Sequence, residues 1–211
     1  MDSSAPEALF TSPDGKYHFA RWGRPIAPVV FGVEEETLRT VKGAIEAVTG
    51  LAGHTVAETD PELGANLMLF FFREWRELSD VPNLDRLIPG LHDLVERLEE
   101  VGANQYRVFR FDEAGAIRAC FAFLRIDEDL AALPAEVIAL DQAVRMILNW
   151  SDRAFAARSP LAEAGGRLML RPEIAAVIRA AYDPVMPASA MDPSHALRLA
   201  ARMSLPGPGA Q

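Results

Sequence analysis

Apolar residues recur along the chain at two spacings, and the spacing separates the predicted helices from the predicted strands. Apolar side chains every three or four residues predict helices over 35–49 and 91–101, and a glycine that can end a helix follows each segment. Three more helices are predicted towards the C-terminus, at about 134–150, 172–182 and 193–203, each with a proline near its start. The C-terminal third of the chain is therefore expected to be mainly helical.

Four shorter apolar segments predict strands. The run 65–72 is apolar almost throughout, which is typical of a central strand covered on both faces. The segments 106–111 and 117–126 flank a turn that contains a glycine, and they predict a β-hairpin beside the central strand. The segment 25–33 contains prolines, which cannot donate a hydrogen bond to a neighbouring strand, so we expect an edge strand there.

Helices and strands mix without regular strand–helix alternation, and this predicts an α+β fold with a small mixed or antiparallel sheet packed against helices. Half of the 211 residues are hydrophobic and about a quarter are charged, which is enough for one sizeable core. We predict a loosely held N-terminal arm over 1–24, a single domain over 25–204 and a flexible tail over 205–211, because both ends are rich in turn-forming residues. The Gly-Gly pair at 165–166 is predicted to link two helices.

The charge and the apolar run lengths restrict the class of partner. The net charge is −9, and because nucleic-acid binding depends on neutralising phosphates with Lys and Arg, no nucleic-acid partner is expected. The longest apolar stretch, 67–72, is far shorter than the roughly 20 residues of a membrane-spanning helix. The first residues show no basic start followed by an apolar segment, so a cytoplasmic location is predicted.

Candidate residues for catalysis are few. Cys120 is the single cysteine, so no internal disulfide can form, and its apolar neighbours predict a buried strand residue instead of a nucleophile. No serine lies in a G-x-S-x-G or S-x-x-K context, and no phosphate loop or dinucleotide-binding motif occurs. No cofactor is therefore predicted.

A metal site would have to start from His92 and Glu96, because the H-E-x-x-H motif of zinc hydrolases does not occur. These two residues share a helix face. Zinc would need a third ligand from one of the remaining histidines, which are His18, His54 and His195. The alternative is that His92 and Glu96 form an ordinary exposed pair, worth a few tenths of a kcal/mol.

Aromatic residues suggest a contact surface. Trp75 and Trp150 are candidates for contacts with a protein partner, since tryptophan combines a large apolar ring with an N–H donor. The alternative is that both side chains belong to the hydrophobic core.

The end of the chain resembles a known family. The segment that starts at Leu168-Met169-Leu170-Arg171-Pro172-Glu173 and runs through Ala181-Tyr182-Asp183-Pro184 to Met191 resembles the end of a bacterial domain family of unknown function, whose members are similar to zincin metallopeptidases. The resemblance implies a peptidase-like helical scaffold, and it also implies export, which would make the location periplasmic. It places three residues on the family's helix pattern, namely Asp141, Gln142 and Asp152. The chain departs from the pattern at Arg145, Leu148 and Ala190, where the family has Gln, Gly and Gly.

Two functions follow from these observations. The sequence favours a non-catalytic protein-interaction or accessory protein on a degenerate peptidase-like scaffold, which contacts a protein partner through its helical C-terminal third or around Trp75 and Trp150. The alternative is a hydrolase, zinc-dependent or otherwise unusual, with a site at Asp141 and Gln142 or at His92 and Glu96. The first is preferred, because neither a trio of metal ligands nor an activated nucleophile can be assembled from neighbouring residues.

Overall fold

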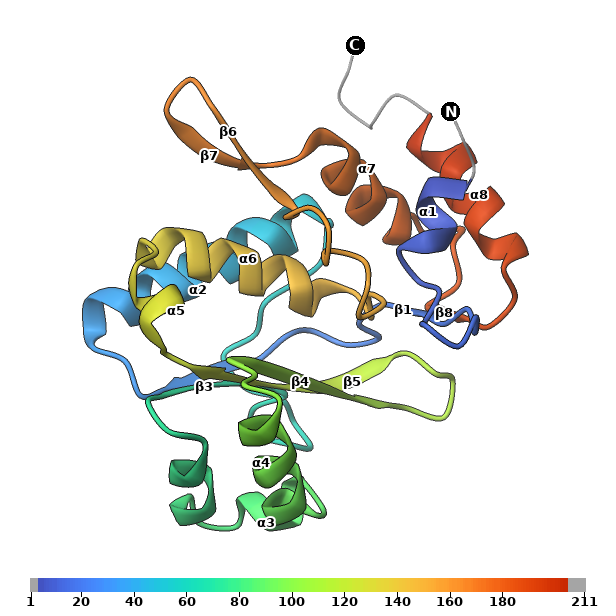
Figure 1. Cartoon of the computed structure of the whole chain (residues 1–211). Helices are drawn as coiled ribbons and strands as arrows, with labels where there is room; N and C mark the ends of the chain where they lie inside the picture. Colours follow the sequence, from blue (N-terminus) through green and yellow to red (C-terminus); the bar gives the residue numbers. More distant parts are fainter. Residues whose placement is uncertain (1–3, 205–211) are drawn as a thin grey trace.

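The computed structural model describes residues 4–204, and it has an α+β fold built on a four-stranded mixed sheet (Figure 1). The strand order is β2-β3-β5-β4, with β2, β3 and β5 parallel and β4 antiparallel to β5. This confirms the predicted fold class. The strands are β2 (Pro28–Phe31), β3 (Leu67–Phe72), β4 (Gln105–Phe111) and β5 (Ile117–Arg125).

The positions of the strands in the sheet follow from their sequences. β2 lies at one edge, as its prolines predict, and β3 lies between β2 and β5. Leu67 and Leu69 of β3 belong to one hydrophobic cluster, whereas Phe70 and Phe72 belong to another on the opposite face. A strand with both faces buried needs apolar residues at every position, and this accounts for the unbroken apolar run of β3.

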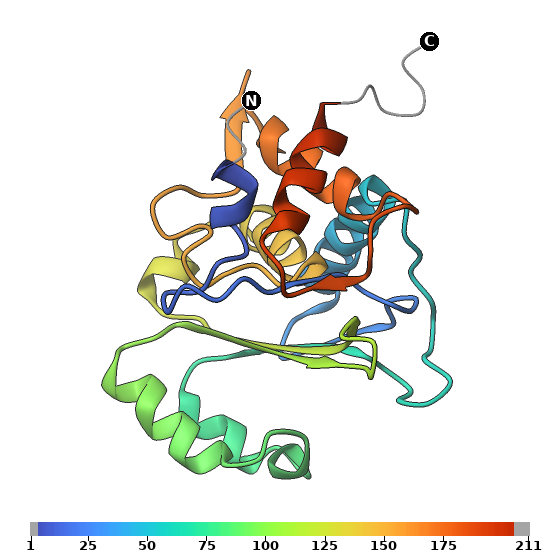
Figure 2. The same ribbon diagram turned by 90° about the vertical axis from the view of Figure 1, so that its right-hand side faces the viewer.

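Helices cover both faces of the sheet (Figures 1 and 2). The helices α2 (Glu35–Leu51) and α6 (Ala135–Ile147) pack against each other on one face. The other face carries a 3-10 helix and two α-helices, which are η1 (Trp75–Asp80), α3 (Leu84–Leu87) and α4 (Leu91–Glu100). The predicted helices at 35–49, 91–101 and 134–150 are thus confirmed to within a few residues.

A helical group lies beyond the end of α6, at the right of Figure 1. It contains the predicted helices α7 (Pro172–Ala181) and α8 (Ser194–Met203), together with the short N-terminal α1 (Ser4–Ala8). The Tyr182 hydroxyl donates a hydrogen bond to the Ile147 carbonyl at 2.9 Å, which joins the end of α7 to the end of α6. None of the described helices combines the length and the apolar character that crossing a membrane requires.

The N-terminal segment is part of the core, so the prediction of a loosely held arm is wrong for residues 6–24. Phe10, Phe19 and Trp22 are each at most 1% exposed. The Trp22 indole donates to the Met146 carbonyl at 2.8 Å. Turn residues separate these aromatic side chains along the sequence, so no regular spacing marks them as core residues. In the fold they fill the space between α6 and α8. Residues 1–3 and the predicted tail over 205–211 lie outside the described residues.

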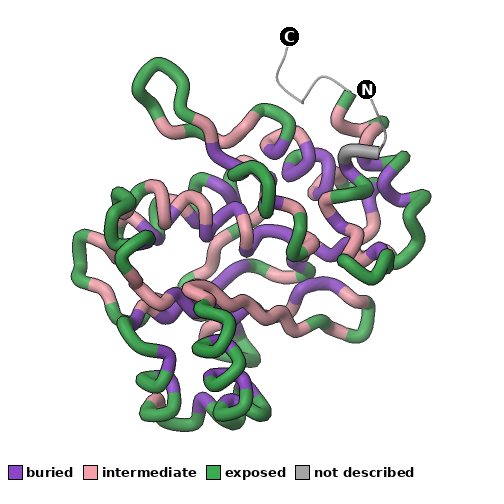
Figure 3. The backbone as a smooth tube through the Cα atoms, in the orientation of Figure 1, coloured by how far each residue is buried: buried purple, intermediate pink, exposed green. Residues whose placement is uncertain are grey.

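The segment after Trp150 also differs from its prediction. The Gly-Gly pair is the turn of a β-hairpin formed by β6 (Leu161–Ala164) and β7 (Arg167–Leu170). Both glycines have positive φ, +59° and +71°, which a two-residue hairpin turn of type I′ requires. The tip of this hairpin is exposed (Figure 3). The structure also contains short elements that the sequence did not predict, among them α5 (Glu128–Ala131) and the pairing of β1 (Phe19–Ala20) with β8 (Ser189–Ala190).

Candidate functional site

The predicted metal candidates form an exposed pair on α4. The distance between His92 Nε2 and Glu96 Oε1 is 3.5 Å, and the two side chains are 80% and 63% exposed. His195 lies on α8, across the sheet from α4, and it is buried against Phe19. Within residues 4–204, no three His, Cys, Asp or Glu side chains are grouped so that they could hold a metal ion. The geometry of His92 and Glu96 thus corresponds to the alternative of a solvent-side pair.

Burial decides the roles of Cys120 and Trp75. Cys120 is fully buried in β5, as predicted, and desolvation raises the pKa of its thiol to about 12, so the thiol is protonated at neutral pH. Trp75 is 1% exposed, and its indole donates to the Ala103 carbonyl at 2.7 Å. The prediction that Trp75 contacts a partner is therefore wrong. Its ring packs against Phe72 in the cluster beneath the sheet. Removing the apolar ring from water in this way stabilises the fold.

Trp150, in contrast, lies beside a cavity. The cavity has a volume of about 620 Å³ and separates β4 from the segment 149–155 that follows α6. The Trp150 ring stacks on Phe10, with centroids 5.2 Å apart, and its indole donates to the Val144 carbonyl. We call this cavity the β4 cleft. It is lined by His18, by residues 104–109 and Phe111 of β4 and its flanks, by Arg145 of α6, and by Asn149, Trp150, Ser151, Asp152 and Phe155.

The floor of the β4 cleft contains a guanidinium group with few partners. Arg107 Nη2 donates to Gln142 Oε1 at 2.6 Å, and the Gln142 amide donates in turn to Gln105 Oε1 at 2.7 Å. Arg107 Nε is shielded from solvent and has no hydrogen-bond partner in the described part of the chain. Desolvation lowers the pKa of Arg107, although the group remains charged at neutral pH because an arginine starts from a very high value. Arg107 forms no ion pair within residues 4–204, and the carboxylates of Asp141 and Asp152 act on it only through space.

The second guanidinium of the cleft is already neutralised. Arg145 Nε donates to Asp141 Oδ2 at 2.6 Å, four residues earlier on α6, and the Arg145 guanidinium lies over the Phe155 ring at 5.1 Å. These two contacts fix the orientation of the Arg145 side chain. Asp152 is exposed at the rim. Of the two guanidinium groups in the cleft, Arg107 is thus the one without an ion pair in the described part of the chain.

The predicted catalytic candidates Asp141 and Gln142 lie side by side on α6, but each of them binds an arginine side chain. Asp141 binds Arg145, and Gln142, which is 1% exposed, binds Arg107. An amide does not titrate, and the Asp141 carboxylate oxygen is engaged by the Arg145 guanidinium. The pair therefore positions positive charge at the cleft, and neither side chain is placed to exchange a proton.

The backbone of β4 adds a second feature to this site. The Arg125 N–H donates to the Asn104 carbonyl at 2.9 Å, so the alternation of an antiparallel ladder directs the backbone groups of residues 106, 108 and 110 towards β5. The groups of Gln105, Arg107 and Phe109 consequently point outward. β4 is the last strand in the sheet order, and no described strand pairs with its outer edge. Most of β4 is half-buried, and it crosses the front of the molecule in Figure 3.

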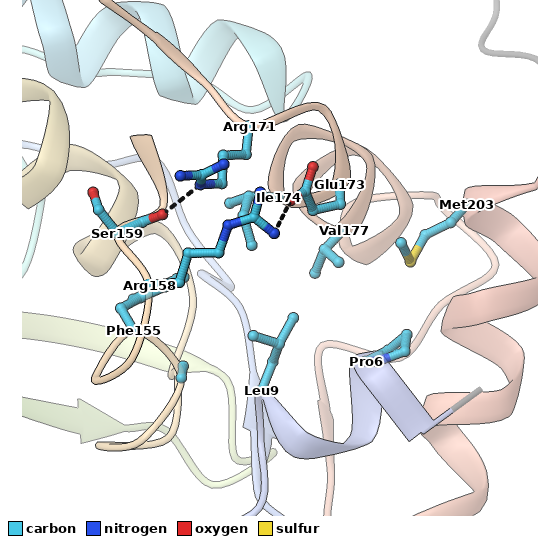
Figure 4. A pocket seen from close by; sticks show the side chains of 11 residues that line it. Pro6, Leu9, Phe155, Arg158, Ser159, Arg171, Glu173, Ile174, Val177 and Met203 are labelled. Atoms are coloured by element: carbon cyan, nitrogen blue, oxygen red, sulfur yellow. Dashed lines mark hydrogen bonds and ion pairs between the residues drawn. The ribbon is translucent and has the colours of Figure 1, made fainter. Parts of the chain in front are cut away.

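A smaller apolar cavity of about 200 Å³ lies between α1, α7, α8 and the segment 154–159 (Figure 4). Leu9, Val177 and Met203 supply apolar walls. Its two arginines are occupied, because Arg158 pairs with Glu173 at 3.3 Å and Arg171 Nε donates to the Ser159 carbonyl at 2.8 Å. Among the described residues that line this cavity, no buried polar side-chain atom lacks a hydrogen-bond partner, in contrast to the β4 cleft.

Sequence reasoning missed Arg107. The signal was present, since residues 105, 107 and 109 lie on one face of the predicted strand and Phe109 shows that this face is partly buried. A charged residue between a glutamine and a phenylalanine on an inward face is unusual, because burying a guanidinium without a carboxylate is costly.

Comparisons of the chain with family models, with curated proteins and with solved structures found no match. The resemblance of 168–191 to a bacterial domain family thus stays a prediction. Function has to be inferred from the geometry of the β4 cleft.

Proposed function

We propose that the chain is a non-catalytic protein-interaction or accessory protein that binds an extended segment of a protein partner along β4. The observation that carries this proposal is the unpaired outer edge of β4 beside a cavity of about 620 Å³. An extended peptide can add a strand to such an edge, with main-chain hydrogen bonds for affinity and neighbouring pockets for specificity. A degenerate peptidase-like scaffold remains part of the proposal, supported by the residues Tyr182, Asp183 and Pro184.

The composition of β4 supports this role. Proteins commonly protect an exposed edge with lysine, with proline or by keeping the strand very short, because an open edge pairs with other chains. β4 is seven residues long and contains neither lysine nor proline, and its bulge lies only at its end, between Arg110 and Phe111. Its charged residues are Arg107 and Arg110, and the inward charge of Arg107 is the one device on this strand that could oppose pairing with an apolar partner. Trp150, one of the predicted contact residues, lies beside this edge in the same cleft.

The hydrolase alternative has less support. Asp141 and Gln142 are bound to arginines, and His92 and Glu96 are an exposed pair on the opposite side of the sheet. Metal analysis separates the two functions. Stoichiometric zinc in the purified protein that is lost in both His92→Ala and Glu96→Ala variants would overturn the proposal.

A displayed library of ten-residue random peptides tests the proposal directly. We expect the protein to enrich peptides whose binding perturbs the amide resonances of residues 104–109. Gln105→Pro removes an outward N–H at the first position of β4, where proline is tolerated, and it should weaken the selected peptides about tenfold. Gln105→Ala is the matched control, because it removes the same side chain and keeps the N–H.

Two results would contradict the proposal. Equal affinities for the Gln105→Pro and Gln105→Ala proteins would show that the peptides do not use the edge of β4. A library that yields no enriched peptide, or only peptides that perturb amides elsewhere, would show that the edge is not a binding surface.

A further inference from the structure

The β4 cleft contains a charged group, Arg107, that forms no ion pair in the described part of the chain, although Asp141 and Asp152 act on it through space. Arg107 donates to one neutral partner, the Gln142 amide oxygen, and forms no ion pair within residues 4–204. Its Nε has no accessible surface and no partner. A guanidinium is recognised most strongly by a carboxylate or phosphate group, which accepts two parallel hydrogen bonds. Because Nε is shielded, an anionic group from outside would bind the Nη end of the guanidinium, where Gln142 is the single described partner.

The position of Arg107 on the strand restricts where that group comes from. The backbone N–H and C=O groups of Arg107 point away from β5, towards the free edge of the sheet. A strand added to β4 in the antiparallel direction would therefore exchange both hydrogen bonds with Arg107. The residue opposite Arg107 would then direct its side chain to the same face of the sheet, with the two Cβ atoms about 5 Å apart. That face is the one on which Gln142 holds the guanidinium and Arg145 forms the cleft wall.

We infer that the segment bound along β4 carries an acidic side chain opposite Arg107, and that Arg107 is the main specificity-determining residue of the cleft. This inference rests on the proposed function. The neighbouring positions extend it to a pattern, because the same face carries Phe109 on one side and Gln105 on the other. Read from its N-terminus, an antiparallel partner segment has an apolar residue opposite Phe109, an acidic residue opposite Arg107 and a polar residue opposite Gln105.

The two residues between these positions face the other side of the sheet. They lie next to Val108 and Tyr106, which pack against the apolar cluster between the sheet and α4. Apolar β-branched residues are suitable there, because they pack well on a half-buried pleated surface. The test probe that follows from this reasoning is the capped pentapeptide acetyl-Leu-Val-Glu-Val-Thr-amide. Its matched control contains Gln in place of Glu, which has the same shape without the charge.

The experiment measures the binding of both peptides to the full chain by amide chemical-shift perturbation at millimolar concentration. We expect both to perturb residues 104–109 and the Glu peptide to bind about tenfold more tightly, as charge-assisted hydrogen bonds are stronger than neutral ones. Arg107→Gln should abolish this preference. Gln142→Glu should abolish it as well, because it supplies an internal carboxylate beside the guanidinium, and it keeps Arg107 in place if the first variant fails to fold.

The outcomes separate this inference from the function on which it rests. If both peptides perturb β4 with equal affinity, the acidic specificity is overturned and binding along β4 stands. If neither peptide perturbs β4, both are overturned, and Arg107 is then an inward charge that prevents edge pairing. Propionate, which resembles the free end of a Glu side chain, is the final probe. Should it perturb the same amides as strongly as the Glu peptide does, the cleft takes a free acid and the inferred peptide segment is wrong.

Discussion

His195 illustrates how a single buried residue links the N- and C-terminal parts of the chain. Its Nδ1 lies 2.7 Å from the Tyr17 hydroxyl, and its ring packs on Phe19 with centroids 4.2 Å apart. The imidazole tautomer sets which of the two groups donates this hydrogen bond, and the second ring nitrogen, Nε2, is buried and has no partner among the described residues. Desolvation, with a smaller contribution from Arg198, lowers the pKa of His195 from 6.5 to about 4.

This shift predicts a loss of stability on mild acidification. Between pH values of about 4 and 6.5, the unfolded chain protonates His195 and the folded chain does not, so the free energy of unfolding falls as the pH is lowered through this window. One such group contributes a slope of up to about 1.4 kcal/mol per pH unit. In His195→Gln, denaturant unfolding at several pH values should show a shallower decline. An unchanged slope would mean that His195 is not a buried neutral group.

At the scale of elements, the connection between β2 and α2 depends on one glycine. Gly32 has a φ of +81°, and a Cβ atom at this position would lie 1.9 Å from the Phe71 carbonyl oxygen. The backbone of β3 thus leaves no space for a side chain there. Gly43 lies inside α2, where a Cβ atom would meet nothing within 4 Å.

These two glycines predict opposite effects of the same substitution. Gly32→Ala should lower the free energy of unfolding by about 3 kcal/mol or more, through a disfavoured φ and a clash with the backbone. Gly43→Ala should raise it by about 0.5–1 kcal/mol, because alanine is the better helix former. Urea unfolding of the two variants measures both. A stabilised Gly32→Ala protein, or equal changes in the two, would show that β2 and β3 do not approach as described.

The elements also show where sequence patterns were sufficient. The helices α2, α4, α6, α7 and α8 and the β4–β5 hairpin were predicted, because periodicity and turn glycines act within each segment. The β6–β7 hairpin was missed because each of its strands has only four residues and its tip is exposed. Too few side chains are buried there to produce an alternating pattern.

For the whole molecule, the burial of the N-terminal segment changes the domain organisation. Phe10, Phe19 and Trp22 form a continuous core with residues of α6, α7 and α8. Deletion of residues 1–24 should therefore abolish cooperative thermal unfolding, because it removes buried aromatic surface that contributes several kcal/mol. Circular dichroism as a function of temperature measures this. A truncated chain that melts at the wild-type temperature would support the prediction that residues 1–24 are loosely held.

A deletion in the exposed hairpin is the control for this truncation. The deletion removes two partner pairs from the hairpin, Glu163 with Leu168 and Ala164 with Arg167. The next pair, Ala162 and Met169, is then connected by the same two glycines. Removal of an even number of pairs keeps the hydrogen-bonding register. This variant should retain a cooperative transition close to that of the wild type.

Patterning along the chain was enough to establish the α+β class, the position of β3 in the middle of the sheet, the edge position of β2 and the burial of Cys120. Each of these depends on the residues of one segment and on whether its faces meet water. The candidate site did not follow from such reasoning. Arg107 and Gln142 are 35 residues apart, and Tyr17 and His195 are 178 apart, so their contacts exist only once the elements pack.

The tertiary structure likewise decided between the two tryptophans. Trp75 and Trp150 have the same chemistry, yet packing buries the first beneath the sheet and leaves the second beside the β4 cleft. The outward direction of the β4 backbone is also a property of the sheet order, which no single segment contains. Periodicity reports which face of an element is buried, whereas a binding site depends on which faces meet, and only the packed chain specifies that.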